Sequence, residues 1–310
     1  MKSYGWLGLL LLAVSEYFLI LRIEPFYSWF YCFAWWSYIL LADNLLLKLR
    51  GRSLFSGRQR ELPAMLFLSV FIWLIFETYN LVVHNWAYDG VVALHGIRWC
   101  GYALAFATVL PGIFITTDLL EHWIFGGRGG PTASESEELR EKPASGVSRI
   151  YVLLGIVMCA APLFWPRYFF ATIWLGPIFL LDPLMEKLGI RSLSLSIVSG
   201  ARRRVWSLLL GGLACGLLWE FWNFWAASRW VYTVPFFGSW KVFEMPVLGF
   251  LGFPPFALEC WILYHLMREA LLRTRPPALR AALWVLIGAT CLLVFYAIDH
   301  KTVIRFAQLH

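Results

Sequence analysis

Two glutamate–asparagine pairs are the residues of this sequence best suited to chemistry. Glu77 precedes Asn80 by three positions, and Glu220 precedes Asn223 by the same interval. That spacing places a carboxylate and a carboxamide on one face of a helix. Both pairs lie near the end of an apolar run long enough to cross a bilayer, where an ionisable side chain is costly to bury. They are therefore functional-site candidates that could exchange protons or coordinate a cation.

An aromatic element follows each pair. It consists of Trp86 and Tyr88 in the first copy, and of Trp230 and Tyr232 in the second. Aromatic residues just beyond a transmembrane helix commonly anchor the protein at the membrane interface. The same rings can line a pocket for an apolar chain, or stabilise a developing cation through cation–π contact.

Two further glutamates occur only in the second half of the chain. Glu244 aligns near Gly101, and Glu259 aligns with Thr116. The adjacent Pro254 and Pro255 are expected to break or kink the helix that carries Glu259 near the middle of the bilayer. A glutamate beside freed backbone carbonyls at that depth is a candidate for function.

These observations define a predicted site. Glu220 and Glu259 are expected to form an acid–base pair, with Asn223 orienting Glu220. The residues expected to contact a substrate are Glu77, Asn80, Trp86, Tyr88, Trp230, Tyr232 and Glu244. A structural alternative stays open, in which each helical glutamate is clamped by an arginine, tyrosine or tryptophan and holds the two halves together. Arg98 is then the expected partner of Glu77, and Lys241 that of Glu220.

The composition predicts an integral membrane protein. Hydrophobic residues make up 60% of the 310 residues and charged residues only 15%, far from the average of soluble domains. Apolar runs predict about nine transmembrane helices, at residues 5–22, 27–47, 62–83, 99–120, 149–165, 168–185, 205–225, 246–268 and 280–299. We expect the first of these to be a retained helix rather than a signal peptide, because its apolar run continues past the small residues at 13–15.

The distribution of basic residues predicts the orientation. With the N-terminus in the cytoplasm, 19 of the 26 lysines and arginines fall in inner segments and 7 in outer ones, as the positive-inside rule requires. The predicted location is the cytoplasmic (inner) membrane, with the C-terminus outside. The net charge of +7 follows from this topology and does not indicate nucleic-acid binding.

The two halves of the chain are expected to be a tandem repeat. The segments 43–54 and 182–193 share seven of twelve residues, and the polar motifs that follow keep a nearly constant offset. The predicted fold is thus all-α, with two parallel four-helix repeats plus a C-terminal helix. The predicted units are a first repeat at 1–125, a flexible linker at 126–148, a second repeat at 149–270 and a ninth helix at 271–310.

The sequence offers no evidence for a cofactor or a metal. The six cysteines are scattered without a CxxC pair, which argues against a zinc or iron–sulfur site. Phosphate-binding loops, zinc-protease motifs and serine-hydrolase motifs are also absent from the sequence.

One family resemblance rests on the second half. Trp219-Glu220-x-x-Asn223, Trp230-x-Tyr232, Phe243-Glu244-x-Pro246 and Pro255-Phe256-x-x-Glu259 together resemble small membrane cyclases of the lycopene-cyclase type. That resemblance implies duplicated helical domains and carboxylates that protonate an isoprenoid alkene. The chain departs from it where the family's proline is followed by paired acids. It is equally similar to bacterial polytopic membrane proteins with tandem four-helix repeats.

Three functions are compatible with these patterns. The first is a membrane protein that binds, and also transforms, an apolar isoprenoid or lipid in an intramembrane pocket. The second is a proton- or cation-coupled transporter or channel. The third is a non-catalytic subunit of a membrane complex. Membrane lipids are the expected partners, and a homo-oligomer stays open.

Overall fold

The computed structural model describes residues 2–126, 148–236 and 238–307. The predicted linker at 126–148 lies outside this range apart from its two end residues. Within the described part, eight helical segments are long and apolar enough to cross a membrane, and α8 (Ser148–Phe164) is a shorter apolar helix. The chain is a multi-pass, mainly helical membrane protein.

The first half contains four long apolar segments. They are α1 (Ser3–Ile20), α2 (Phe30–Arg50), α4 (Leu62–Val83) and the pair α5 (His95–Phe106) and α6 (Val109–Phe125). The short α3 (Leu54–Gly57) lies in the connection between α2 and α4. Left-handed backbone at Gly51 ends α2, a conformation that glycine adopts without steric cost.

The second half begins with α8 and then turns through α9 (Pro166–Phe169) and the 3-10 helix η1 (Phe170–Trp174) into α10 (Gly176–Lys187). It continues with α11 (Leu193–Val198), α12 (Arg203–Trp225), the 3-10 helix η2 (Val247–Gly252), α13 (Phe253–Arg273) and α14 (Pro277–Lys301). Pro254 and Pro255 stand in the first turn of α13, where a missing N–H costs no hydrogen bond. The expected kink is therefore a helix start preceded by a 3-10 turn.

Strands form at one end of the helical bundle, which we call the strand end. β1 (Trp86–Val92) pairs antiparallel with β2 (Arg229–Tyr232) and parallel with β5 (Val303–Ala307). A second, two-stranded sheet joins β3 (Lys241–Val242) to β4 (Met245–Pro246). These strands differ from the predicted all-α fold, although β-branched and aromatic residues dominate β1.

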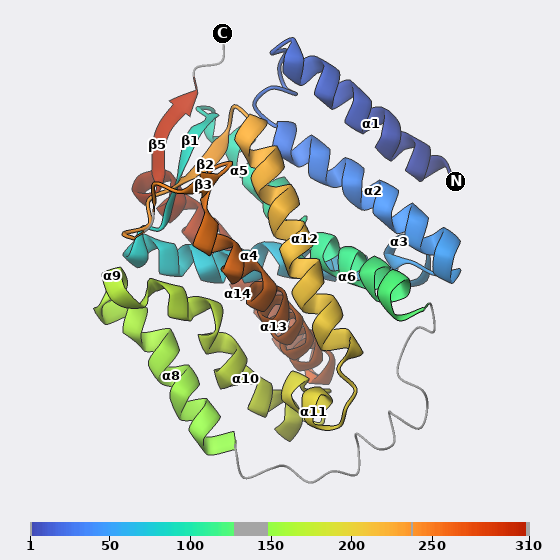
Figure 1. Ribbon diagram of the computed structural model, residues 1–310, viewed down its shortest axis with the longest axis vertical. Helices are drawn as coiled ribbons and strands as arrows, with labels where there is room; N and C mark the ends of the chain where they lie inside the picture. Colours follow the sequence, from blue (N-terminus) through green and yellow to red (C-terminus); the bar gives the residue numbers. More distant parts are fainter. Residues whose placement is uncertain (1, 127–147, 237, 308–310) are drawn as a thin grey trace.

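Two helical pairs flank the bundle. α1 packs on α2 at one side, and α8 packs on α10 at the other, with α4, α12, α13 and α14 between them (Figure 1). Gly212 and Gly216 of α12, four residues apart, permit the close approach of α13, because a Cβ at either position would collide with Phe253. Small residues at this spacing are typical of membrane helix contacts.

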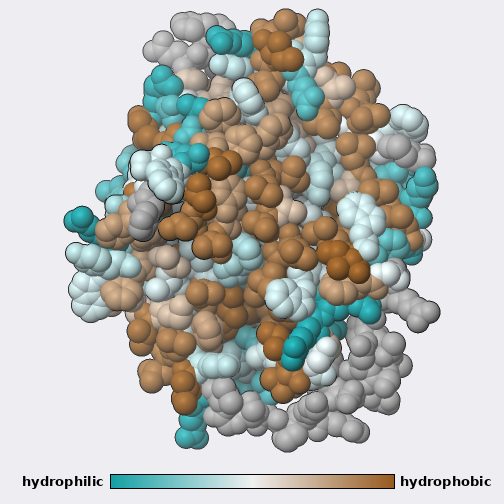
Figure 2. Space-filling view, viewed as in Figure 1, coloured by the Kyte–Doolittle hydropathy of each residue, from teal (hydrophilic) through white to brown (hydrophobic). Residues whose placement is uncertain are grey.

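Hydrophobic residues dominate the visible surface (Figure 2). Large apolar side chains such as Leu10, Leu153, Leu251 and Leu293 are more than three-fifths exposed. Such exposure would be unfavourable in water and is expected for helices that face lipid.

Candidate functional site

Glu77 is fully buried in the last turns of α4 and accepts three hydrogen bonds on one oxygen. Trp73 Nε1 donates to Glu77 Oε1 at 3.0 Å, and Trp86 Nε1 donates to the same atom at 2.9 Å. The hydroxyl of Tyr88 completes the set. The second oxygen, Oε2, is buried and has no hydrogen-bond partner in the part of the chain that the structure describes. We call Glu77, Asn80, Trp86 and Tyr88 the first unit.

Glu220 occupies the corresponding place near the end of α12 and has fewer donors. Tyr232 Oη donates to Glu220 Oε1 at 2.8 Å, and Trp230 Nε1 does so at 3.4 Å. Its Oε2 also lacks a hydrogen-bond partner. We call Glu220, Asn223, Trp230 and Tyr232 the second unit. Both carboxylates are completely shielded from solvent.

The two asparagines fix the chain where it leaves each helix. Asn80 Nδ2 donates to the carbonyl of Trp86 at 2.8 Å, and Asn80 Oδ1 accepts from the Trp86 N–H at 3.2 Å. Asn223 binds the carbonyl and the N–H of Trp230 in the same way, at 2.8 and 2.9 Å. Each carboxamide thus satisfies the backbone N–H and carbonyl of the tryptophan that follows its helix. It thereby positions the aromatic element next to the glutamate.

The tyrosines of both units are hydrogen-bond donors over a wide pH range. Burial, together with the neighbouring Glu77, raises the pKa of Tyr88 well above its usual value near 10. Burial and Glu220 raise the pKa of Tyr232 in the same direction. A protonated phenol donates to a carboxylate, so each hydroxyl supports the glutamate behind it.

Strand pairing brings the aromatic elements of the two units together. Trp86 lies opposite Tyr232, and Tyr88 lies opposite Trp230, about a centre at Ala87 and Val231. These four aromatic residues line a cavity of about 190 Å³ at the strand end. Its other walls include Trp29, Tyr31, Trp73, Tyr102, Phe106, Trp174, Trp219 and Phe256. The cavity is mainly aromatic and apolar, with few polar groups.

The predicted carboxylates lie behind this lining. Glu77, Glu220, Glu244 and Glu259 are all absent from the described residues that line the cavity. Instead, Glu77 and Glu220 reach its wall through the tyrosine and tryptophan of their own unit. Glu244 lies near Arg229 Nη1 at 3.4 Å and Lys241 Nζ at 3.8 Å, and Arg229 lines the cavity.

Glu259 lies apart from both units. It is fully buried in α13, and both of its carboxylate oxygens lack a hydrogen-bond partner among the described residues. Its electrostatic neighbours are Tyr79, Cys159 and Cys260. Glu220 has a different set of neighbours, which includes Tyr31, Tyr232 and Glu244.

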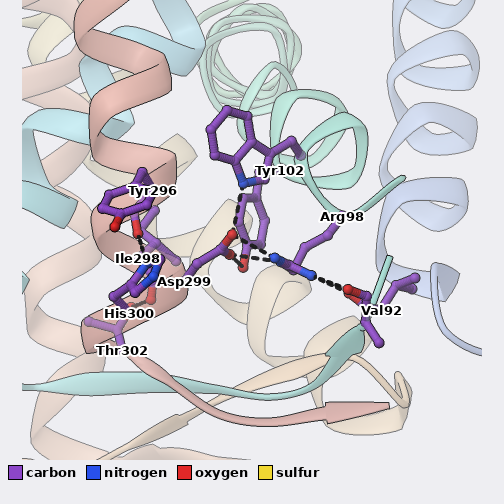
Figure 3. Close-up of polar contacts among 10 residues, drawn as sticks. Val92, Arg98, Tyr102, Tyr296, Ile298, Asp299, His300 and Thr302 are labelled. Atoms are coloured by element: carbon purple, nitrogen blue, oxygen red, sulfur yellow. Dashed lines mark hydrogen bonds and ion pairs between the residues drawn. The ribbon is translucent and has the colours of Figure 1, made fainter. Parts of the chain in front are cut away.

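The cation expected beside Glu77 has another partner. Arg98 forms a two-pronged ion pair with Asp299 of α14, from Nε at 2.7 Å and from Nη2 at 2.6 Å. Tyr102 and Trp99 also donate to Asp299, and Arg98 Nη1 donates to the carbonyls of Val92 and Ala93 (Figure 3). The predicted Arg98–Glu77 pair is therefore wrong, because Arg98 forms its ion pair with Asp299 of the last helix.

The predicted Lys241–Glu220 pair is also wrong. Lys241 lies beside Glu244, three residues further along the chain. Glu220 is bound by neutral donors instead. Tyrosine and tryptophan, two of the three residue types expected in the structural alternative, thus clamp each carboxylate. These donors come from the same half of the chain as their glutamate.

Sequence reasoning missed two classes of residue at the site. Trp73 lies four positions before Glu77, a helical spacing that could have identified it as a donor. Asp299 gave no such signal, because the pairing with Arg98 spans 201 residues. Trp29, Trp174 and Phe256 likewise reach the cavity from distant parts of the chain.

The aromatic lining of the cavity determines which contacts it can offer. Within the described residues, no group of three or more histidines, cysteines, aspartates or glutamates could hold a metal ion. Aromatic faces can pack against a hydrocarbon, and they also attract a cation that forms near them.

Comparisons with known proteins give no relative from which to transfer a role. No protein-family model, no curated protein and no solved structure matches this chain.

Proposed function

We propose that this multi-pass membrane protein binds an apolar chain, an isoprenoid or the hydrocarbon part of a lipid, in the aromatic cavity at the strand end. The observation that carries the proposal is the lining, to which both units contribute a tryptophan and a tyrosine. The polar atoms of Tyr88 and Tyr232 already bond to glutamates. The surface left for a ligand is therefore mostly ring carbon, which favours a hydrocarbon.

A cavity-filling substitution tests this proposal. Ala105 of α5 is half-buried and lines the cavity, whereas the neighbouring Leu104 is 41% exposed outside it. We expect Ala105→Phe to remove a co-purifying isoprenoid or lipid that wild type and Leu104→Phe retain. Mass spectrometry of solvent extracts from equal amounts of folded protein measures this. Equal retention by all three proteins would contradict the proposal.

The proposal extends to chemistry on the bound chain. Tyr232, which lines the cavity, would give its proton to an alkene carbon and receive one from Glu220, leaving Glu220 as a carboxylate and the chain as a carbocation that the surrounding rings stabilise. Asn223 would position this unit, and Glu220, once a carboxylate, would take up the proton that the carbocation loses. Glu259 lies apart from both units, so we assign it no part in this step. The contact of Glu220 with Tyr232 on the cavity wall supports this role.

The lipid profile of an expressing host tests the chemical step. A product that appears with wild type and is lost with Glu220→Gln, at matched expression, is the expected result. Unchanged lipid profiles in a host that contains candidate isoprenoids would contradict the chemical step and leave only the binding proposal.

Proton- or cation-coupled transport is a second candidate, favoured by Glu259. A carboxylate with two unpartnered oxygens inside a membrane bundle is a typical site for a transferred proton or cation. Proton flux into proteoliposomes that is lost in Glu259→Gln would support transport. Absence of flux in wild type would count against it.

We also infer that the two halves arose by duplication. Asp43 accepts from the N–H of Phe55 at 3.1 Å, and Asp182 accepts from that of Ser194 at 2.9 Å, each twelve residues on. The antiparallel pairing of β1 with β2 about one centre supports a twofold relation between the units.

The predicted location is the cytoplasmic membrane with the N-terminus inside. A cysteine-accessibility assay of residues in α3 and β5 tests that orientation.

A further inference from the structure

A second cavity lies at the other end of the bundle, which we call the arginine end. Its volume is about 530 Å³, and residues from both halves of the chain line it. Arg204 at the start of α12 lines this cavity, whereas Trp219 of the same helix lines the aromatic one. Fifteen residues of helix separate them, or about 22 Å at 1.5 Å per residue. The two cavities are thus separate sites.

Arginines predominate among the described charged residues that line this cavity. Seven arginines and three carboxylates are found there. Glu61 serves both Arg58 and Arg268, at 2.7 and 2.8 Å. The remaining two acids are Asp118 and Glu121 on α6.

The two acids on α6, Asp118 and Glu121, interact with two arginines. Arg204 bonds to both Asp118 and Glu121, and Arg50 Nη1 lies 4.0 Å from Asp118. Arg50 Nε and Arg204 Nε are buried without a hydrogen-bond partner among the described residues. Buried guanidinium N–H groups that lack an acceptor are costly, so an oxyanion in the cavity would stabilise them.

Two hairpin loops contribute an arginine each from matching positions. Arg52 follows α2, and Arg191 follows α10, within the two segments that share seven of twelve residues. Arg52 makes no ion pair with any described residue. Arg191 Nε donates to Ser196 Oγ at 3.3 Å, which orients its side chain at the cavity wall. The guanidinium fork matches the oxygens of a phosphate group.

The remaining lining is apolar. Leu46, Leu54, Phe114, Ile115 and Trp261 lie among the charged residues. A ligand that carries a phosphate at one end and a short apolar part at the other would satisfy both surfaces. A purely hydrocarbon ligand would offer no acceptor to the guanidinium groups, among them the buried Nε atoms of Arg50 and Arg204.

We propose that the cavity at the arginine end binds a phosphate-bearing amphiphile, whose phosphate oxygens bridge Arg52 and Arg191 between the two halves of the chain. Two sources share this chemistry: the headgroup of an anionic membrane lipid and a soluble phosphate compound. The site is independent of the aromatic cavity and of the function proposed for it.

The test uses the full-length protein in an uncharged detergent, with inorganic pyrophosphate as the soluble probe. Titration calorimetry should give a dissociation constant that rises about tenfold or more in Arg52→Gln and in Arg191→Gln, as expected for a lost charge-assisted hydrogen bond. Arg60→Gln is the matched control, since Arg60 is exposed at the same end but lies outside the cavity lining. Its constant should change less than about twofold.

A lipid arm separates the two sources. Protein reconstituted in phosphatidylcholine vesicles with or without phosphatidylglycerol is released and analysed by native mass spectrometry. Phosphatidylglycerol retained by wild type and by Arg60→Gln, but lost from Arg52→Gln, assigns the site to a lipid headgroup. Pyrophosphate binding alone, with the same variant pattern, assigns it to a soluble phosphate compound. If neither probe binds, or if Arg60→Gln weakens binding as much as Arg52→Gln, the proposal is overturned.

Discussion

The two glutamate units have the same hydrogen-bonding plan but differ in how tightly they are closed. In the first unit, three donors meet Glu77, and the side chains of Trp86 and Tyr88 are buried. In the second unit, two donors meet Glu220, and its aromatic residues are only half-buried. The second unit is therefore the more open of the two.

The last helix accounts for this difference. β5 follows α14 and covers the free edge of β1, so β1 is the central strand of the sheet and β2 is an edge strand. The Arg98–Asp299 pair fixes α14 to α5 beside the first unit. α14 and β5 thus cover the first unit, whereas the second unit is less buried. Both units line the aromatic cavity, but the first is the more rigidly held of the two.

Asp299→Ala should have the largest effect on stability, because it breaks the ion pair that holds α14 against the first unit. Both side chains of the pair are less than 10% exposed, and the substitution leaves Arg98 as an unpaired buried charge. We expect a loss of about 3–5 kcal/mol in the free energy of unfolding. Denaturant titration in detergent micelles measures it. A loss below about 1 kcal/mol would mean that α14 is not needed to close the first unit.

Substitution of each glutamate by alanine should lower the free energy of unfolding by different amounts in the two units. Glu77→Ala leaves three buried donors without an acceptor, at about 1 kcal/mol or more each, and we expect a loss of about 3 kcal/mol. Glu220→Ala leaves two donors that are half-buried, so about 1–2 kcal/mol is expected. Both variants are compared by thermal unfolding under one condition. Equal losses would contradict the unequal closure of the units.

The tyrosines give a pH-dependent version of the same comparison. The pKa of Tyr88 and of Tyr232 is raised in the folded protein by burial and by the glutamate beside it. The unfolded chain therefore releases these protons first, near pH 10. Stability from each tyrosine is full below pH 10 and falls above it by up to about 1.4 kcal/mol per pH unit.

Phenylalanine variants test this dependence. At pH 8, Tyr88→Phe should cost about 1–2 kcal/mol and Tyr232→Phe about 1 kcal/mol. Above pH 10, each variant should lose stability less steeply than wild type. Unfolding midpoints at pH 8, 10 and 11 measure how steeply stability falls with pH. Tyr17→Phe is the control, because Tyr17 is 60% exposed. Parallel slopes for wild type and both variants would refute the shifted titration.

The smallest effect is expected for Arg305→Ala on β5. Its ion pair with Asp89 at 3.0 Å is largely exposed, with 70% of the arginine side chain accessible. Such pairs contribute less than about 1 kcal/mol. This variant also serves as the control for Asp299→Ala, because both contacts join the C-terminal elements to the first half. A cost as large as that of Asp299→Ala would show that β5, rather than the buried pair, closes the first unit.

The sequence alone was sufficient for the membrane class and for most helices. Apolar runs of helical length are a local property of the chain, so they predicted segments such as α2, α4 and α12 within a few residues of their ends. The spacing of Glu77 and Asn80 predicted that both lie on one face of a helix, but it did not predict that Asn80 binds the backbone that leaves this helix.

Only the tertiary structure determined which groups meet. Asp299 and Arg98 are 201 residues apart, and the pairing of β1 with β2 depends on how two helical halves pack. Long-range contacts of this kind leave no periodic signal in the chain, which is why Arg98 was assigned to the wrong carboxylate. The aromatic cavity and the arginine-lined cavity form for the same reason: residues from both halves converge only after the helices have packed.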